Sequence, residues 1–290
     1  MTRWAVRFGY DGSRFHGWAQ QPGVRTVEGD ILSGLVRHGV SPPTTLTSIA
    51  VASRTDRGVS ARANVLVVES TLEPPALLRA LNGIGPELFF TAAVNVPPEF
   101  RVRRAVRRTY RYFLRPNQPH LATWRRAARL FQGPVDVRTF GRGIGSESPV
   151  FRSVERVRVV PRKDGGWVEV SAPFFVWGMV RKIVGTLGQA GEGRLSLARL
   201  ESAIRGTERL TVPLAPPEPL VLWDVEYPFR WTFRSSRPSR HQALWWVTER
   251  ERLSTHSRVL QALEQAAAPA APHVRVAPGG TRRRRLNRGD

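Results

Sequence analysis

At 290 residues, 41% of them hydrophobic, the chain is long enough to bury a core and is not disordered as a whole. Its 45 Lys and Arg against 23 Asp and Glu give a formal net charge of +22, which predicts a polyanionic partner, with nucleic acid before a membrane surface. No cysteine is present, which excludes disulfides, thiolate catalysis and cysteine-ligated metal sites. No apolar run reaches membrane-spanning length. A strand pattern starts directly after Met1 and leaves no signal peptide, so we expect a cytoplasmic protein without a membrane contact.

The first third of the chain follows an order of strands and helices. Apolar and charged side chains alternate over residues 3–10, which predicts a half-buried strand. Thr26 is placed to cap a helix whose apolar stripe would pack on the sheet. A run of small and β-branched residues from Ser48 predicts a buried strand that delivers Asp56 to a turn at Gly58. A further strand is expected at 64–69, a short helix at 75–81 and another strand at 88–96.

Pro97 and Pro98 mark a break, after which a similar order returns loosely. The expected elements are strands at 105–114, 153–160, 166–171 and 220–227, and helices at 121–131, 176–189 and 196–205. This order predicts an α+β fold class with two similar half-domains and a cleft between them.

Four segments are therefore expected along the chain. The N-terminal half-domain, 1–98, carries Asp56, and the C-terminal half-domain, 99–228, completes the cleft. A helical extension follows at 229–265, where residues 243–265 fit a helix, and then a basic flexible tail at 266–290. For the arginines of the tail, contact with phosphate and a solvated disordered end are both open, and we favour the solvated end.

Asp56 is the first candidate for chemistry. Its neighbours Arg54 and Arg57 favour the ionised carboxylate, because nearby positive charge stabilises the anion. Such a carboxylate can serve as a nucleophile or as a base. The plainer alternative is that Asp56 only caps the turn before Gly58, which is ordinary turn chemistry. The six histidines show no metal-ligand spacing, so no metal site is expected.

An ordered set of motifs resembles one protein family. Residues 53–60, Ser-Arg-Thr-Asp-Arg-Gly-Val-Ser, resemble the Gly-Arg-Thr-Asp-Ala-Gly-Val-His signature of the TruA family of tRNA pseudouridine synthases. Further stretches match in the right order, namely residues 10–18, 25–28, 107–112, 179–185 and 220–227. Together they span roughly residues 3–228, and their order makes the resemblance strong where each alone would be weak.

The resemblance implies a fold and an activity. The half-domains would join mostly antiparallel strands into a continuous sheet, with helices on one side and the active cleft between the halves. The enzyme would be an isomerase that converts uridine to pseudouridine at positions 38, 39 and 40 of the tRNA anticodon stem-loop. Because this isomerisation involves no redox change and loses no group, neither a nucleotide nor any other cofactor is expected. The family also implies a homodimer with tRNA as its partner.

The same resemblance implies roles for five residues. Asp56 would be the catalytic residue, with attack on the nucleoside and removal of a sugar proton both left open. Arg181 would pair with Asp56, and Tyr110 would stack on the target base. Arg54 would fill the space of the displaced base, and Leu220 would line the pocket.

Some residues depart from the family pattern. Ser60 replaces a histidine and favours an archaeal-like branch, and Pro219 replaces a glycine before Leu220. Arg57 replaces an alanine, and Trp177 with Gly178 replaces paired histidines, both expected at the periphery of the site. The main alternative is a non-catalytic RNA-binding protein of the same fold. A DNA-binding protein is a further alternative, although no helix-turn-helix, zinc-finger or basic-zipper pattern is found.

Overall fold

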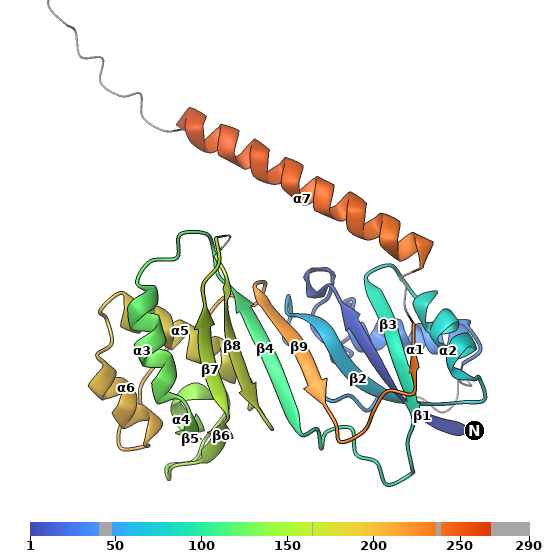
Figure 1. The fold of residues 1–290 in the computed structure, drawn as a ribbon, viewed down its shortest axis with the longest axis horizontal. Helices are drawn as coiled ribbons and strands as arrows, with labels where there is room; N and C mark the ends of the chain where they lie inside the picture. Colours follow the sequence, from blue (N-terminus) through green and yellow to red (C-terminus); the bar gives the residue numbers. More distant parts are fainter. Residues whose placement is uncertain (41–47, 164, 236–238, 268–290) are drawn as a thin grey trace, which may run out of the picture. The chain divides into compact units, whose positions relative to one another are not determined.

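The computed structural model describes residues 1–40, 48–163, 165–235 and 239–267 (Figure 1). The chain divides into two compact units, Met1–Trp245 and Trp246–Asp290. Among the described residues, every strand and every helix except the last lies within the first unit. Its elements up to the middle of the chain are β1 Thr2–Tyr10, a 3-10 turn Gly12–Arg14, α1 Val27–Arg37, β2 Ser60–Ser70, α2 Pro74–Asn82, β3 Leu88–Asn95 and β4 Arg107–Phe113.

The second half of this unit is richer in short elements. They are α3 Leu121–Leu130, β5 Gly133–Asp136, α4 Val137–Phe140, β6 Phe151–Val154, β7 Arg156–Val160, β8 Trp167–Ala172, α5 Met179–Gly191, α6 Leu197–Ile204, β9 Leu220–Glu226 and β10 Phe233–Arg234. The last helix, α7 Arg240–Ala267, begins in the first unit and continues into the second.

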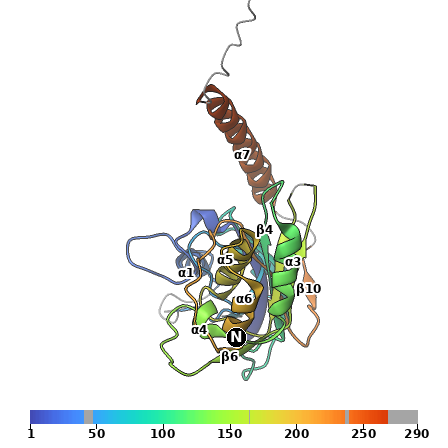
Figure 2. The same ribbon diagram turned by 90° about the vertical axis from the view of Figure 1, so that its left-hand side faces the viewer.

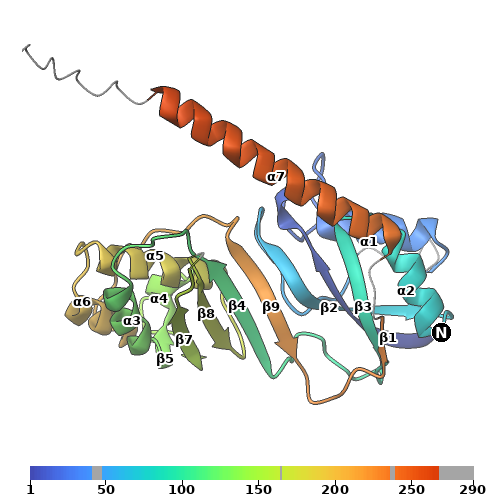
Figure 3. The same cartoon turned by 45° about the horizontal axis from the view of Figure 1, so that its top comes forward.

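One eight-stranded sheet runs through the first unit in the order β10-β3-β1-β2-β9-β4-β8-β7 (Figure 3). All its neighbours pair antiparallel except β2 and β9, which run parallel. The parallel pair is short, with Ser60 opposite Val221 and Ala61 opposite Leu222. In the sheet, β2 is the last strand of the group β3-β1-β2 from the N-terminal half, and β9 is its neighbour from the C-terminal half. We call this pair the seam of the sheet. The predicted α+β class with a continuous, mostly antiparallel sheet is confirmed.

Helices α1 and α5 lie on the same side of the sheet, as the view in Figure 2 shows. Thr26 caps α1, since its hydroxyl oxygen accepts from the Gly29 amide at 3.2 Å, and Ile31 and Leu35 are buried. Along α5, buried positions recur at helical spacing from Met179 to Leu187. The amphipathic stripes read from the sequence therefore bury against this face, while α3 packs beside the edge strand β7.

The strand expected from Ser48 is only partly formed. Val51 makes a single bridge to Leu66, flanked by hydrogen bonds between Ala52 and Val65 and between Val67 and Ala50. From Ser53 onward the fully buried side chain of Asn64 takes over the pairing. Its amide donates to the Ser53 carbonyl at 2.8 Å, and its oxygen accepts from the Ser53 amide at 3.3 Å. The segment therefore leaves the ladder and becomes the loop that carries Asp56.

The strand expected over 153–160 is also different in the structure. It breaks at Glu155 into β6, which pairs with β5 in a separate two-stranded sheet, and β7, which pairs with β8. The carboxylate of Glu155 accepts a hydrogen bond from Arg107 at 2.5 Å. The helix expected over 243–265 is found as α7, which begins earlier, where Gln242 is buried and donates to Asn82 and the Leu88 carbonyl. Of the predicted tail, 266–290, the first two residues belong to α7, and the rest lies outside the described residues.

The turn between β1 and α1 requires Gly12 to approach the chain before β2. A Cβ added at Gly12 would overlap the backbone carbonyl of Val59, and the Gly12 amide donates to Ser60 Oγ at 3.0 Å. We expect Gly12→Ala to lower the free energy of unfolding by about 1 to 3 kcal/mol, since the backbone must shift. Gly145→Ala is the matched control, because its Cβ would meet no heavy atom within 4 Å. Denaturant unfolding followed by tryptophan fluorescence measures both, and equal stability of the two variants would contradict the prediction.

Candidate active site

A cavity of about 440 Å³ lies at the seam of the sheet. Its walls come from the loop 51–59, from β4, from the segment 174–181 that enters α5, and from the start of β9. All five residues that the sequence nominated line this cavity, namely Asp56, Tyr110, Arg181, Arg54 and Leu220. Residues distant in sequence, from both halves, therefore meet in one hollow.

Asp56 and Arg181 form an ion pair within the cavity. The guanidinium Nη1 of Arg181 lies 2.7 Å from Asp56 Oδ2, and the Arg181 and Asp56 side chains are only 12% and 23% exposed. Arg181 Nε also donates to the Ala215 carbonyl at 2.7 Å, which fixes the plane of the guanidinium. The turn after Asp56 is closed by the Val59 amide donating to the Asp56 carbonyl, with Gly58 at φ 82°. The turn at Gly58 therefore fixes the backbone of Asp56, and the guanidinium of Arg181, itself held by the Ala215 carbonyl, binds the Asp56 carboxylate.

Tyr110 stands on β4 with its hydroxyl 2.7 Å from Ser53 Oγ. Its ring packs edge-on against Phe175, with ring centroids 5.2 Å apart and an interplanar angle of 89°. Burial raises the pKa of the Tyr110 phenol, and the hydrogen bond to Ser53 acts in the opposite direction. The phenol therefore stays protonated through the neutral range and is available as a proton donor or acceptor group.

The other two nominated residues take peripheral places. Leu220 is 4% exposed and forms an apolar patch of the wall where β9 begins. Arg54 is exposed at the rim. Thr55 lies between Arg54 and Asp56 in the loop, and its hydroxyl is 2.8 Å from the buried hydroxyl of Tyr10. A side chain of β1 therefore helps to fix the loop that carries Asp56.

Arg108 is a site residue that the sequence analysis missed. Its side chain is almost fully buried and donates to the carbonyls of Ala52, Arg103 and Pro173, so it ties together three segments around the cavity. Burial lowers the pKa of Arg108 from its ordinary value. The sequence did hold a signal for Arg108. It lies two residues before Tyr110 on the same strand, so the two side chains share a face of the sheet.

Trp177 was expected at the periphery of the site, and this was wrong. Its indole Nε1 donates to Asp56 Oδ1 at 2.8 Å, so Trp177 contacts the central carboxylate directly. The helix expected over 176–189 begins only at Met179, so Trp177 lies in the irregular segment before α5, where no helix period applies. The contact depends on how that segment bends at Gly178, which has φ 74°.

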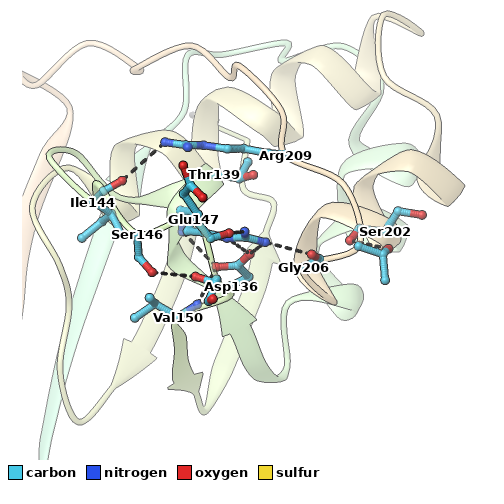
Figure 4. Close-up of polar contacts among 12 residues, drawn as sticks. Asp136, Thr139, Ile144, Ser146, Glu147, Val150, Ser202, Gly206 and Arg209 are labelled. Atoms are coloured by element: carbon cyan, nitrogen blue, oxygen red, sulfur yellow. Dashed lines mark hydrogen bonds and ion pairs between the residues drawn. The ribbon is translucent and has the colours of Figure 1, made fainter.

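A polar cluster around Asp136 holds the loop that follows α4 (Figure 4). Asp136 is almost fully buried and accepts from the amides of Arg138 and Val150 and from the Arg138 guanidinium at 2.7 Å. Burial alone would raise the pKa of Asp136, but its hydrogen bonds from Arg138 and Val150 lower it below the ordinary value. Arg138 also donates to the Gly206 carbonyl, and Lys182 donates to the carbonyls of Thr139 and Gly141. The loop after α4 is therefore anchored on two sides.

Two kinds of feature are not found in the described part of the chain. No group of three or more His, Cys, Asp or Glu side chains is arranged there to hold a metal ion. No helix among the same residues combines the length and apolar character needed to cross a bilayer.

Comparison with known proteins defines the class of protein first. A family model described as tRNA pseudouridine synthase matches residues 127–228. The chain is 40% identical over 227 residues to tRNA pseudouridine synthase A of Thermococcus kodakarensis, covering 77% of this chain and 84% of that protein. The enzyme of the same name from Pyrococcus horikoshii is 36% identical with the same coverage. That of Methanosphaerula palustris is 32% identical, covering 91% of this chain and 93% of its own.

These matches identify an RNA-modifying isomerase. The chain belongs to the tRNA pseudouridine synthase family. The relatives compared come from archaea, and the resemblance stated from the motifs is confirmed.

Burial of the tyrosines predicts a dependence of stability on pH. Burial raises the pKa of Tyr10, Tyr110, Tyr112 and Tyr227, the four tyrosines of the chain, above the ordinary value of 10.0. Above that pH the unfolded chain releases phenol protons that the folded chain keeps, so stability is full below it and falls as pH rises. We expect phenolate absorbance to stay low at pH 10 and then to rise together with loss of circular dichroism. Phenolate formation near pH 10 in a protein that stays folded would contradict this.

Proposed function

We propose that this enzyme isomerises uridine at positions 38, 39 and 40 of the tRNA anticodon stem-loop, with Asp56 as the catalytic residue. The observation that carries the proposal is the Asp56–Arg181 ion pair at 2.7 Å inside a cavity that also holds Tyr110. A hollow of about 440 Å³ is of the size that takes a single extruded nucleotide.

The proposed chemistry follows from what the reaction must do. The bond between N1 of uracil and C1′ of the sugar breaks, the base turns, and a bond between C5 and C1′ forms. C5 then loses its proton and N1 gains one, so the product is an isomer of uridine. Asp56 acts either by attacking the nucleoside or by removing a sugar proton, and both routes need an ionised carboxylate. The guanidinium of Arg181 lies 2.7 Å from the Asp56 carboxylate and pairs with it. The isomerisation is redox-neutral, so it requires no redox cofactor.

The walls of the cavity suit a base that must be held and also turned. The ring of Tyr110 offers a flat apolar surface, and its hydroxyl can take part in the final removal of the C5 proton. Leu220 supplies a second apolar contact that imposes no hydrogen-bond pattern on the base. Arg54, exposed at the rim, is placed to occupy the gap that an extruded base leaves, which offsets part of a cost of a few kcal/mol.

Charge supports tRNA as the partner. The net charge of +22 and the exposed side chains of Arg54, Arg57 and Arg103 near the cavity favour binding to phosphate, with a strong dependence on salt. We also propose a homodimer in the cytoplasm, and light scattering of the purified chain tests the dimer. A non-catalytic RNA-binding role is the second candidate. It is disfavoured because exposed arginines would serve binding alone, without a carboxylate held in a cavity.

Asp56→Asn tests the catalytic assignment. We expect turnover to be lost while tRNA affinity stays within about threefold, because one charge in the cavity is removed and no phosphate contact changes. Tritium release from C5-labelled uridine in tRNA reports turnover, and filter binding reports affinity. Asp224→Asn is the matched control, since Asp224 pairs with Arg7 at 2.8 Å outside this cavity. Appreciable product from Asp56→Asn would remove Asp56 from the chemistry.

Two substitutions of Tyr110 separate its ring from its hydroxyl. Tyr110→Phe keeps the stacking face, worth about 1 to 3 kcal/mol per base, and loses the hydroxyl bonded to Ser53. We expect Phe to slow the step after glycosidic cleavage, and Ala to weaken engagement of the base as well. Tyr112→Phe, on the same strand, is the control. Single-turnover rates and affinities measure both effects, and full activity of both Tyr110 variants would exclude Tyr110 from the site.

A further inference from the structure

Both oxygens of the Asp56 carboxylate accept a hydrogen bond from the segment at the start of α5. Arg181 Nη1 lies 2.7 Å from Oδ2, and Trp177 Nε1 lies 2.8 Å from Oδ1. The two donors differ in kind, because the guanidinium brings a positive charge and the indole does not. Each carboxylate oxygen accepts one of these bonds and keeps a further lone pair. The carboxylate is thus held at two points without losing its capacity to react.

Trp177 is itself held, although its residue is 57% exposed. The guanidinium carbon of Arg142 lies 3.9 Å from the centroid of the indole ring, which is a cation–π contact. The Arg142 amide donates to the Trp177 carbonyl at 2.8 Å. A Cβ added at Gly178 would lie 3.1 Å from Arg142 Cγ and Cδ, so the glycine leaves room for this stacking. Arg142 follows Gly141, whose carbonyl is bonded to Lys182 at 2.8 Å.

We propose that Trp177 is a positioning residue that fixes the rotation of the Asp56 carboxylate through its indole N–H. This inference rests on the proposed function of Asp56. Arg181 bonds only one oxygen, so it leaves the carboxylate free to rotate about the Cβ–Cγ bond. The second bond from Trp177 stops that rotation and aims the free lone pairs in one direction. A fixed orientation of the reacting group lowers the barrier to reaction, and a small misplacement is costly.

The chemistry of the donor predicts which kinetic constant changes. The indole N–H is neutral, so it adds no attraction for phosphate and does not contribute to the salt dependence of RNA binding. Loss of the N–H should therefore reduce the rate of the chemical step and leave RNA affinity nearly unchanged. A structural or RNA-contacting role of Trp177 would instead reduce stability or affinity.

Trp177→Phe tests this, because it deletes the N–H and keeps a ring beneath Arg142. We expect the single-turnover rate at saturating enzyme to fall about tenfold on an unmodified tRNA transcript, with Kd within about twofold. The matched control is Trp167→Phe. Trp167 also lies under an arginine, with Arg111 4.6 Å from its ring, and its buried Nε1 has no hydrogen-bond partner among the described residues. We expect Trp167→Phe to retain the wild-type rate.

A second measurement does not depend on activity. The indole N–H resonance of Trp177, assigned by its loss in Trp177→Phe, should shift in Asp56→Ala, because its acceptor is gone, and should not shift in Asp224→Asn. An unmoved resonance in Asp56→Ala, or a Trp177→Phe rate within twofold of wild type, would overturn the proposal. A rate loss matched by an equal loss of affinity would also overturn it. If Asp56→Asn keeps turnover, the proposed function fails instead, and the resonance still reports the bond.

Discussion

The ion pair between Asp56 and Arg181 is the interaction around which the site is built, because it joins the N-terminal and C-terminal halves of the first unit beside the short pairing of β2 and β9. Between β2 and β9 the ladder has only two residue pairs, and the ion pair crosses between the halves beside it. With both side chains largely shielded from water, neither charge is well solvated alone. Removing one partner would leave the other uncompensated, so the site and the seam depend on the same contact.

The loops around the site are held by hydrogen bonds from two cationic side chains, Arg108 and Lys182, to backbone carbonyls. Arg108 donates to carbonyls of three separate segments, and Lys182 donates to the carbonyls of Thr139 in α4 and of Gly141 just after it. Irregular backbone near a cavity exposes such carbonyls, and each must find a donor when buried. Burial lowers the pKa of both cations. Since arginine and lysine keep a high intrinsic basicity, they remain charged and can bind carbonyls from loops that share no regular ladder.

Sequence reasoning found the residues whose positions follow from a period or a motif. Asp56, Tyr110 and Arg181 were named from motifs, and the structure brings them into one cavity. Arg108 was within reach by strand alternation with Tyr110. The contact of Trp177 with Asp56 could not be found, because 121 residues separate them and the approach depends on the loop before α5. Helix α1 was predicted from its cap and its apolar stripe, whereas the four-residue α4 was not predicted. The strand expected from residue 48 is only partly formed, because hydrogen bonds of the Asn64 side chain replace the ladder at Ser53, and no sequence period shows this.

A register shift keeps the cavity free of a second carboxylate. Tyr110 of β4 lies opposite Leu222 of β9, but the preceding residue Thr109 lies opposite Asp224, so β9 carries one extra residue at Trp223. Trp223 and Asp224 consequently both line the opposite face of the sheet, beside Thr109. In an unbroken alternation Asp224 would share the face of Leu222 and Leu220, and Leu220 lines the cavity. The extra residue therefore places the two carboxylates on different faces of the sheet. Asp56 pairs with Arg181 in the cavity, and Asp224 pairs with Arg7 outside it.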